Sequence, residues 1–207
     1  MNRSTAPAEI AGVLLAAGMS TRMGSNKLFL SLGDRDTVLS RAVATGVAAG
    51  LDPLLVVVGH EAERVRAALR GTAARTVFNP DYARGQNTSL RTGIAAVPDG
   101  VAAAVVLLAD MPLVDAEMIR SLVTRWRESG APLAISRYGD VVAPPIVYGA
   151  ALFGELRSLR HDACGKSVIK RHRGEEVAVD WPAERLTDLD VPEDVARANV
   201  RTAREAP

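Results

Sequence analysis

The first of three segments whose residue types could do chemistry runs from Leu15 to Lys27 and reads LAAGMSTRMGSNK, directly after an apolar run. Small residues and glycine let several backbone N–H groups surround one anion. Arg22 and Lys27 add positive charge of the kind that holds a polyphosphate. No lysine directly follows Gly24, which excludes a Walker A loop, and the Gly-x-Gly-x-x-Gly dinucleotide pattern is absent. We predict a different kind of phosphate loop, and the alternative is a basic surface turn.

The second segment, NPDYARGQNTSL at residues 79–90, joins a short apolar run to a helical pattern. Asn79 precedes a proline and is therefore held extended, which can point its side chain into a crevice. Gly85 allows a tight turn, and one of the polar residues at 87–89 can cap the next helix. The positive N-terminal end of that helix would then face a ligand. A turn followed by a cap without any ligand is the alternative.

The third segment places Asp110 after the strongest apolar run of the chain, residues 101–108, and before Met111-Pro112. Mg²⁺ is typically held in proteins by one or two carboxylates together with water and phosphate oxygens. An Asx turn before the proline is the alternative. We favour the metal role, because this carboxylate and the phosphate loop both follow predicted strands and would share one edge of a sheet.

The elements that must position these segments alternate between strand and helix patterns. Strands are predicted at 10–16, 54–58, 75–78, 101–108, 133–136, 146–148 and 176–179. Helices are predicted at 37–46, capped by Thr37, and at 61–69, 88–97, 115–128, capped by Asp115, 150–159 and 166–172, with a last helix starting at Pro192. Residues 139–145 are expected to be irregular. This order predicts an α/β fold with a mostly parallel sheet covered on both faces.

Composition limits the possible partners. The chain has 207 residues, 48% hydrophobic and 24% charged, so we expect one domain over residues 1–207. A net charge of +1 and an aromatic content of 4% argue against nucleic-acid binding. A single cysteine suggests a reducing compartment, and no apolar run reaches the length of a membrane span. Cleaving the apolar run near the N-terminus as a signal peptide would remove the phosphate loop, so we expect a cytoplasmic protein.

The three motifs occur in the order Leu-Ala-Ala-Gly-x-Ser-x-Arg-Met-Gly-x-x-Lys, Asn-Pro-x-Tyr-x-x-Gly-x-x-x-Ser and Asp-Met-Pro. Over residues 12–198 the chain resembles the molybdenum cofactor cytidylyltransferases of the MobA-like NTP transferase family. The resemblance implies a three-layer Rossmann-like nucleotidyltransferase fold with a mostly parallel sheet. It also implies an enzyme that transfers CMP from CTP to the phosphate of molybdopterin and releases pyrophosphate, with Mg²⁺ as cofactor.

The resemblance also implies roles for individual residues. Catalytic roles fall on Arg22, Lys27 and Asp110, of which Asp110 would hold Mg²⁺. Nucleotide contacts fall on Leu15, Ala16, Ala17, Gly18, Arg22, Lys27, Asn79, Gly85, Ser89 and Asp110. The guanylyltransferase relatives read Leu-Ala-Gly-Gly, and the extra methyl of Ala17 favours the smaller pyrimidine, hence CTP over GTP.

The C-terminal half carries the implied acceptor site. Asp188 and Asp190 lie in a segment that resembles the acidic closing motif of the family. We favour Asp188 as a second metal neighbour, and Asp190 is either a ligand or a helix cap. The implied acceptor-binding residues are Pro145, Asp162, Gly165 and Lys166. Around them Ala143-Pro144-Pro145 replaces the usual Gly-His-Pro, and Lys166 replaces an arginine, which leaves the acceptor open.

Three readings remain. The first is a cytidylyltransferase that acts on a molybdopterin-type acceptor, whose product would serve a client molybdenum hydroxylase. The second is a guanylyl- or sugar-phosphate nucleotidyltransferase. The third is a non-catalytic chaperone for the molybdenum cofactor. Lys27 and Asp110 favour an enzyme, since a carrier needs neither. A phosphate acceptor is ionised near neutral pH, so the reaction requires no general base.

Overall fold

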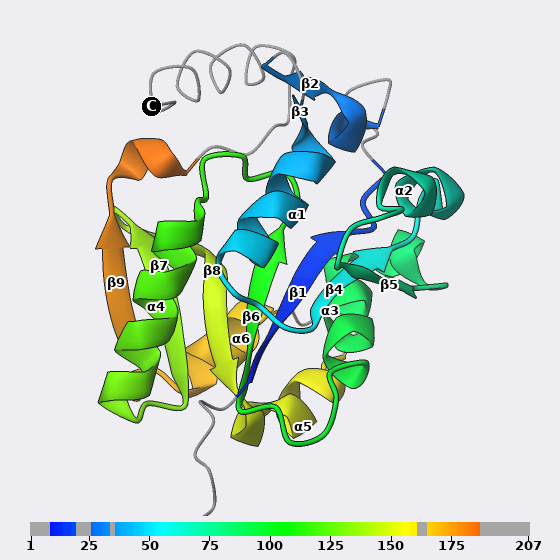
Figure 1. Ribbon diagram of the computed structural model, residues 1–207. Helices are drawn as coiled ribbons and strands as arrows, with labels where there is room; N and C mark the ends of the chain where they lie inside the picture. Colours follow the sequence, from blue (N-terminus) through cyan, green and yellow to red (C-terminus); the bar gives the residue numbers. More distant parts are fainter. Residues whose placement is uncertain (1–8, 20–25, 34–35, 161–164, 187–207) are drawn as a thin grey trace, which may run out of the picture.

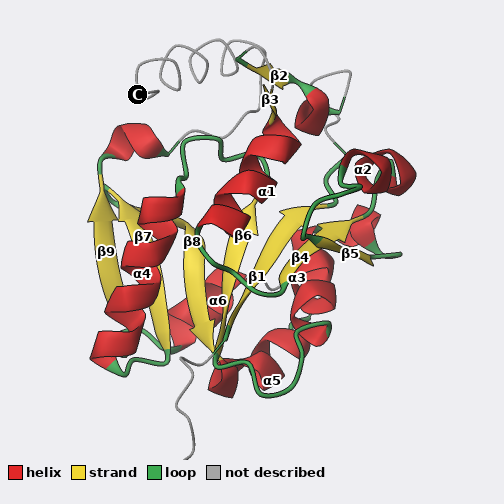
Figure 2. Ribbon diagram, in the orientation of Figure 1, coloured by secondary structure: helices red, strands yellow, loops and turns green. Residues whose placement is uncertain are grey.

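A computed structural model describes residues 9–19, 26–33, 36–160 and 165–186, and its centre is a seven-stranded sheet (Figures 1 and 2). The strands are β1 (Ile10–Ala16), β4 (Leu54–Val58), β5 (Arg75–Phe78), β6 (Ala103–Leu108), β7 (Leu133–Tyr138), β8 (Val141–Gly149) and β9 (Val177–Trp181). They lie in the order β5-β4-β1-β6-β8-β7-β9, and within this sheet only β8 runs antiparallel to its neighbours. The predicted mostly parallel sheet is confirmed.

Helices cover both faces of the sheet, which gives three layers. One face carries α1 (Val38–Ala48), α2 (Ala62–Ala68) and α4 (Ala116–Ser129). The other carries α3 (Gln86–Ala95), α5 (Phe153–Arg157) and α6 (Gly165–Arg171). Short elements complete the fold, namely η1 (Lys27–Phe29), the pair β2 (Ser31–Leu32) and β3 (Asp36–Thr37), η2 (Tyr82–Arg84), η3 (Ala150–Leu152) and η4 (Ala183–Arg185). Among the residues described, no helix combines the length and apolarity that crossing a membrane requires.

The continuous apolar strands follow from burial on both faces. In β1, Leu14 packs into the core under α1, α2 and α4, whereas Leu15 packs into the core under α3, α5 and α6. The strand pairs in parallel with both β4 and β6, and Leu15 lies opposite Leu108 at the end of β6. The loops that follow β1 and β6 therefore leave the sheet side by side, at the edge where α/β folds bind ligands.

Two predicted helix caps are confirmed. The Thr37 hydroxyl accepts a hydrogen bond from the Ser40 N–H at 3.1 Å, and the Ser40 hydroxyl accepts one from the Thr37 N–H in return. The Asp115 carboxylate accepts a hydrogen bond from the Met118 N–H at 2.8 Å at the start of α4. Both caps satisfy N–H groups that the first turn of a helix leaves without partners.

The predicted start of α3 is wrong. The helix begins at Gln86 and its N-cap is Gly85, whose φ of 116° suits glycine, without a side-chain cap from residues 87–89. Thr88 and Ser89 lie inside the first turns and are buried. Their hydroxyls accept hydrogen bonds from the side-chain amide of Asn79 and not from N–H groups of the first turn, so they do not cap the helix.

The prediction of an irregular segment at 139–145 is wrong for most of its length, because β8 begins at Val141. Ile146 lies opposite Ile135 of β7, but Ala143 lies opposite Ser136, so Pro144 and Pro145 have no partners across the strand pair. Proline cannot donate to a ladder and is tolerated at such a bulge. The Tyr138 hydroxyl donates to the Pro144 carbonyl at 2.9 Å and fixes the bulge from the neighbouring strand.

Other predicted boundaries differ in length. The expected helix at 150–159 is divided into η3 and α5, and the expected strands at 133–136 and 176–179 continue to Tyr138 and Trp181. The helix expected at Pro192 lies outside the described residues.

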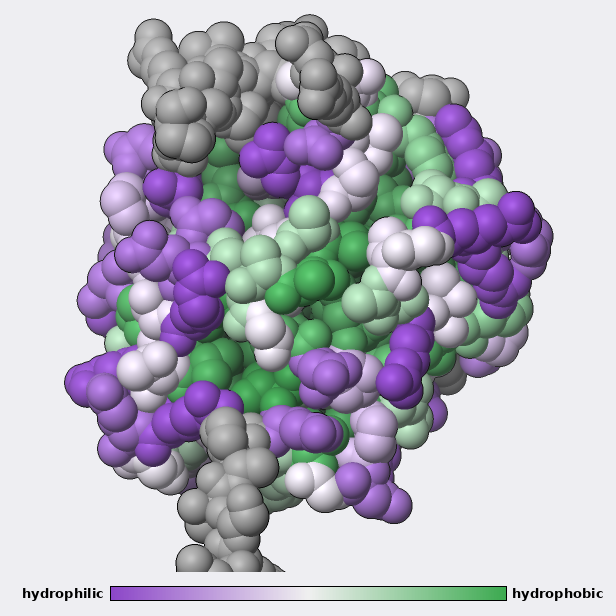
Figure 3. Space-filling view, viewed as in Figure 1, coloured by the Kyte–Doolittle hydropathy of each residue, from purple (hydrophilic) through white to green (hydrophobic). Residues whose placement is uncertain are grey.

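On the face viewed in Figure 1, hydrophilic side chains gather over α4 and α2 at the two margins, and apolar side chains show between them (Figure 3). This is the pattern of amphipathic helices laid on an apolar sheet.

Candidate active site

A cleft opens where the loops after β1 and β6 meet the start of α3, and we name it the Gly18 cleft. Its volume is about 260 Å³. It is lined by Leu15, Ala16, Ala17, Gly18, Met19, Lys27, Leu28, Tyr82, Ala83, Gly85, Gln86, Ser89, Leu108, Ala109 and Asp110. The Ala109 N–H donates to the Leu15 carbonyl at 3.1 Å, which ties the start of the Asp110 loop to the end of β1. Backbone and small side chains thus form much of the wall.

Among the described residues, one ion pair provides the charged side chains that line this cleft. The Lys27 Nζ lies 2.6 Å from the Asp110 Oδ2, and the two side chains are 15% and 24% exposed. Lys27 is placed by η1, whose N-cap Asn26 accepts a hydrogen bond from the Leu28 N–H at 3.1 Å. The cation and the carboxylate of this pair both still reach water, which suits a ligand that carries both phosphate and a metal ion.

A buried amide orients one hydroxyl of the cleft. Asn79 is 1% exposed, and its Oδ1 accepts a hydrogen bond from the Asp81 N–H at 3.0 Å. Its Nδ2 must therefore be the donor to the Thr88 Oγ1 at 2.8 Å and to the Ser89 Oγ at 2.9 Å. The Thr88 hydroxyl donates onward to backbone carbonyls. The structure gives no acceptor for the Ser89 hydroxyl proton among the described residues, so this proton is available to a ligand in the cleft.

The wall beside Ala17 is close-packed. A Cβ placed on Gly59 would lie 2.4 Å from the Tyr82 Cβ and 3.0 Å from the Ala17 Cβ, so only glycine fits between them. The Tyr82 ring lies 6.3 Å from the His60 ring, in a tilted arrangement. The Ala17 methyl is therefore backed by packed side chains and cannot easily retreat from a ligand.

A second cleft adjoins the first, and we name it the Tyr148 cleft. Its volume is about 320 Å³. It is lined by Leu15, Gln86, Asn87, Leu90, Val106, Leu108, Asp110, Met111, Ala143, Pro144, Ile146, Tyr148, Gly165 and Lys166. Most of this wall is apolar. Four residues also line the Gly18 cleft, namely Leu15, Gln86, Leu108 and Asp110.

The structure brings most of the predicted site residues to these two clefts. The Gly18 cleft holds Leu15, Ala16, Ala17, Gly18, Lys27, Gly85, Ser89 and Asp110, and the Tyr148 cleft holds Gly165 and Lys166. Asn79 lines neither, because its side chain is buried beneath Thr88 and Ser89 instead of pointing into the crevice. Pro145 is also buried and lines neither, although Pro144 does. Arg22, Asp162, Asp188 and Asp190 lie outside the described residues.

Several side chains of these walls were not predicted from the sequence, and Tyr82, Gln86 and Tyr148 are three of them. Tyr82 and Gln86 line the Gly18 cleft, and both belong to the second motif, so their positions were visible as part of that segment. Tyr148 was read only as part of a strand, and no local signal shows that its face of β8 borders a cleft.

The residues present suit a hard divalent cation. The described ranges contain no group of three or more His, Cys, Asp or Glu that could form a complete metal shell. Asp110 instead offers a carboxylate at a cleft mouth, which matches the way Mg²⁺ binds with one or two carboxylates and completes its shell with water and phosphate oxygens.

The family model described as MobA-like NTP transferase domain matches residues 12–177. Purine catabolism protein PucB of Bacillus subtilis (strain 168) is 30% identical over 197 residues, which cover 88% of this chain and 92% of that protein.

Solved structures show the same similarity. Rv0371C from Mycobacterium tuberculosis H37Rv, in complex with manganese, superposes with a TM-score of 0.72 at 31% identity, covering 94% of this chain and 100% of that one. Molybdopterin-guanine dinucleotide biosynthesis protein A from Archaeoglobus fulgidus gives a TM-score of 0.69 at 17% identity, covering 94% and 99%, and is alike in fold.

Proposed function

The chain belongs to the MobA-like NTP transferase family and is a nucleotidyltransferase, and on this premise we propose that it transfers CMP from CTP to the phosphate of a molybdopterin-type acceptor and releases pyrophosphate. The observation that carries the proposal is the shared wall of the two clefts, with Asp110 at their junction. A transfer between two substrates needs two adjoining sites and charge stabilisation where they meet.

In the proposed reaction an oxygen of the acceptor phosphate attacks the α-phosphorus of CTP, and the bond to pyrophosphate breaks. No proton has to be removed, since the attacking phosphate is already ionised. The backbone after β1 surrounds the phosphates, and Lys27 neutralises charge on the leaving pyrophosphate. Arg22 would add a second cation from the same loop.

Asp110 is the residue that we propose holds Mg²⁺, with Asp188, and also Asp190, as further candidates in the C-terminal segment. The manganese complex of the mycobacterial relative supports a divalent cation here. When bound, such a cation supplies positive charge that lowers the repulsion between phosphate oxygens during transfer. The chain's own part is to keep Asp110 at the cleft junction, through the Ala109–Leu15 backbone hydrogen bond.

The walls of the two clefts support the choice of substrates. The Ala17 methyl, backed by Tyr82 across Gly59, narrows the Gly18 cleft and favours a pyrimidine over a purine. The apolar part of the Tyr148 cleft wall suits a flat ring system, and Gln86 and Asn87 in the same wall offer amide partners for its polar edge. Lys166, which lines this cleft, is a candidate for holding the polar end of the acceptor. Asp162 is a second candidate, because the family resemblance assigns it to the acceptor site.

We also propose that residues 1–207 form one domain, that the enzyme acts in the cytoplasm, and that its product passes to a client molybdenum hydroxylase. The single cysteine of the chain agrees with a reducing compartment.

The test is pyrophosphate release from purified protein with Mg²⁺, molybdenum-loaded molybdopterin and each of the four NTPs in turn. Release with CTP alone is expected. Release with GTP would keep the transfer chemistry but contradict the role of Ala17. Release only when glucose 1-phosphate replaces molybdopterin would favour a sugar-phosphate enzyme. Molybdopterin binding without release from any NTP would favour a non-catalytic carrier.

A further inference from the structure

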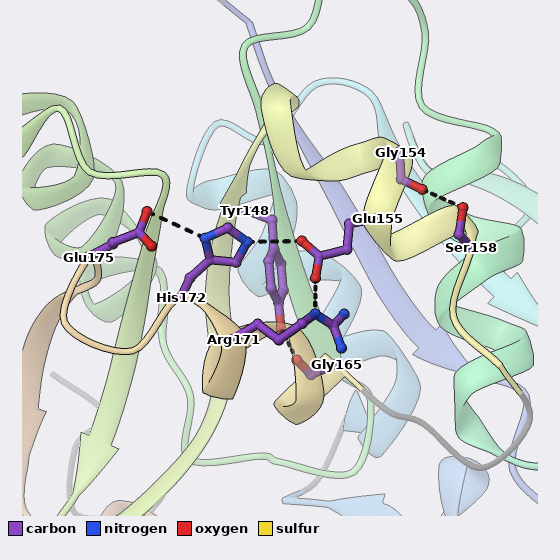
Figure 4. A network of polar contacts seen from close by, with 8 residues as sticks. All are labelled: Tyr148, Gly154, Glu155, Ser158, Gly165, Arg171, His172 and Glu175. Carbon is purple, nitrogen blue, oxygen red and sulfur yellow. Dashed lines mark hydrogen bonds and ion pairs between the residues drawn. The ribbon is translucent and has the colours of Figure 1, made fainter.

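One carboxylate joins α5 to the end of α6. Glu155 of α5 accepts a hydrogen bond from the Arg171 Nε, and its Oε2 lies 2.9 Å from the His172 Nε2. The other ring nitrogen of His172 lies 3.4 Å from the Glu175 carboxylate. Figure 4 shows the Glu155 carboxylate between the two basic side chains, so that a single acidic group holds two consecutive residues.

The opposite end of α6 is pressed against the wall of the Tyr148 cleft. The Tyr148 hydroxyl donates to the Gly165 carbonyl at 3.3 Å (Figure 4). A Cβ placed on Gly165 would lie 3.0 Å from that hydroxyl and 3.1 Å from the Leu90 Cδ2, so this helix approaches β8 and α3 closely. Gly165 and Lys166, at this same end, line the Tyr148 cleft.

The helix between these two ends is too short to hold its own position. It has seven residues, whereas isolated helices in water are marginal below about 12–15 residues. Val168 is its one fully buried residue, and Ile169 packs against the same core while only partly buried, so few apolar side chains anchor the helix. Tyr148 at one end and Glu155 at the other add polar contacts that contribute to its position.

We propose that Glu155 is a positioning residue for the second substrate. By holding Arg171 and His172, it fixes the position of the whole of α6, whose opposite end carries Gly165 and Lys166 into the wall of the Tyr148 cleft. Glu155 does not line the cleft and acts only through this helix. The inference rests on the proposed function, in which the Tyr148 cleft receives the acceptor.

Backbone amide hydrogen exchange tests, without any substrate, whether Glu155 holds α6 in place. Glu155→Ala is compared with Asp180→Ala, which removes another exposed ion pair between two elements, that of β9 with Arg137 of β7. We expect exchange at Val168 and Ile169, whose N–H groups close the first turn of α6, as well as at 170–172, to quicken about fivefold in Glu155→Ala, the scale of losing a partly exposed ion pair. Exchange at Val168 and Ile169 should not change in Asp180→Ala. Acceleration confined to residues 170–172 would overturn the proposal.

The kinetic test separates the two substrates. In the pyrophosphate assay, Glu155→Ala should raise the KM for molybdopterin about fivefold and leave the KM for CTP and kcat unchanged. Glu155→Gln should restore most of this loss at pH 8, because the amide can accept from Arg171 and donate to neutral His172. Equal increases in both KM values would overturn the proposal. If the wild-type protein releases no pyrophosphate, the proposed function fails, and amide exchange at Val168 and Ile169 alone decides whether Glu155 holds α6 in place.

Discussion

Lys27 and Asp110 neutralise each other across 2.6 Å in the ligand-free chain. Both side chains still reach water, and ion pairs in contact with water stabilise a fold little. Separating them to admit a triphosphate and a metal ion therefore costs little, and each then gains a partner of opposite charge.

Replacing Lys27 tests this view at the residue scale. Lys27→Ala should lower kcat/KM for CTP about 100-fold, since it removes a preorganised positive charge that faces the phosphates. Pyrophosphate release under steady-state conditions measures the loss. Arg70→Ala, an exposed cation that follows α2, is the matched control and should behave as wild type. An unchanged rate in Lys27→Ala would show that this lysine does not face the triphosphate.

Ser89 and Thr88 form a matched pair for a second prediction. Each hydroxyl accepts one hydrogen bond from Asn79, so Ser89→Ala and Thr88→Val both leave one N–H of the buried amide without a partner. Thr88→Val also removes the donor to the Asp81 and Gly85 carbonyls, so its thermal stability should fall further than that of Ser89→Ala. Only Ser89 lines the Gly18 cleft, so only Ser89→Ala should weaken CTP binding, by about fivefold to tenfold, as expected for one lost hydrogen bond.

Calorimetric titration with CTP and Mg²⁺ measures the affinity of both variants. Equal weakening in Thr88→Val and Ser89→Ala would mean that the amide network shapes the cleft as a whole and that the Ser89 proton has no separate role.

At the scale of elements, the contact between α5 and α6 should depend on pH. The hydrogen bond to Glu155 raises the pKa of His172 above its ordinary value, and Glu175 adds to the effect. Partial burial works to raise the pKa of Glu155, but the hydrogen bonds from His172 and Arg171 outweigh it, so this pKa lies below its usual range. The stabilisation from charged His172 is therefore complete below the pKa of an unfolded histidine and is lost as pH rises through the raised value.

We therefore expect faster local opening of α6 at pH 8.5 than at pH 6, beyond the ordinary base catalysis of amide exchange. Comparing residues 165–172 with residues of α4 in the same sample removes that intrinsic effect. His172→Gln should abolish the extra acceleration. An α6 that loosened toward low pH, between pH 8.5 and 6, would contradict the direction of these pKa shifts.

At the scale of the whole molecule, the sequence predicted the parts that local chemistry determines. The continuous apolar run at 54–58, which ends in three valines, is typical of a buried strand, and Thr37 and Asp115 had the residue types that cap helices. The meeting of the loops after β1 and β6 at one edge of the sheet could be predicted because both strands were expected to run parallel. These features need no knowledge of distant partners, which is why they were predictable.

The parts that failed depend on partners far along the chain. Asn79 was expected to face a ligand, but Thr88 and Ser89, nine and ten residues later, bind its amide. Pro144 and Pro145 look incompatible with a strand until the register of β7 shows a bulge. Glu155 and His172 are 17 residues apart and match no motif, so only the packing of α5 against α6 reveals their contact.

The ligand should stabilise the whole molecule, because the Gly18 cleft is built from β1, η1, η2, α3 and the end of β6 and exists only when they are assembled. A ligand that binds the folded state alone adds about 2.7 kcal/mol at 100 times its Kd. For a chain of this length that corresponds to a rise in Tm of about 5–10 °C. We expect this rise with CTP and Mg²⁺. With CTP and EDTA the rise should be much smaller, because the Asp110 carboxylate repels the triphosphate when no metal ion lies between them. Scanning calorimetry of wild type and Lys27→Ala measures both effects, and an equal rise with EDTA would show that CTP binds without the metal ion.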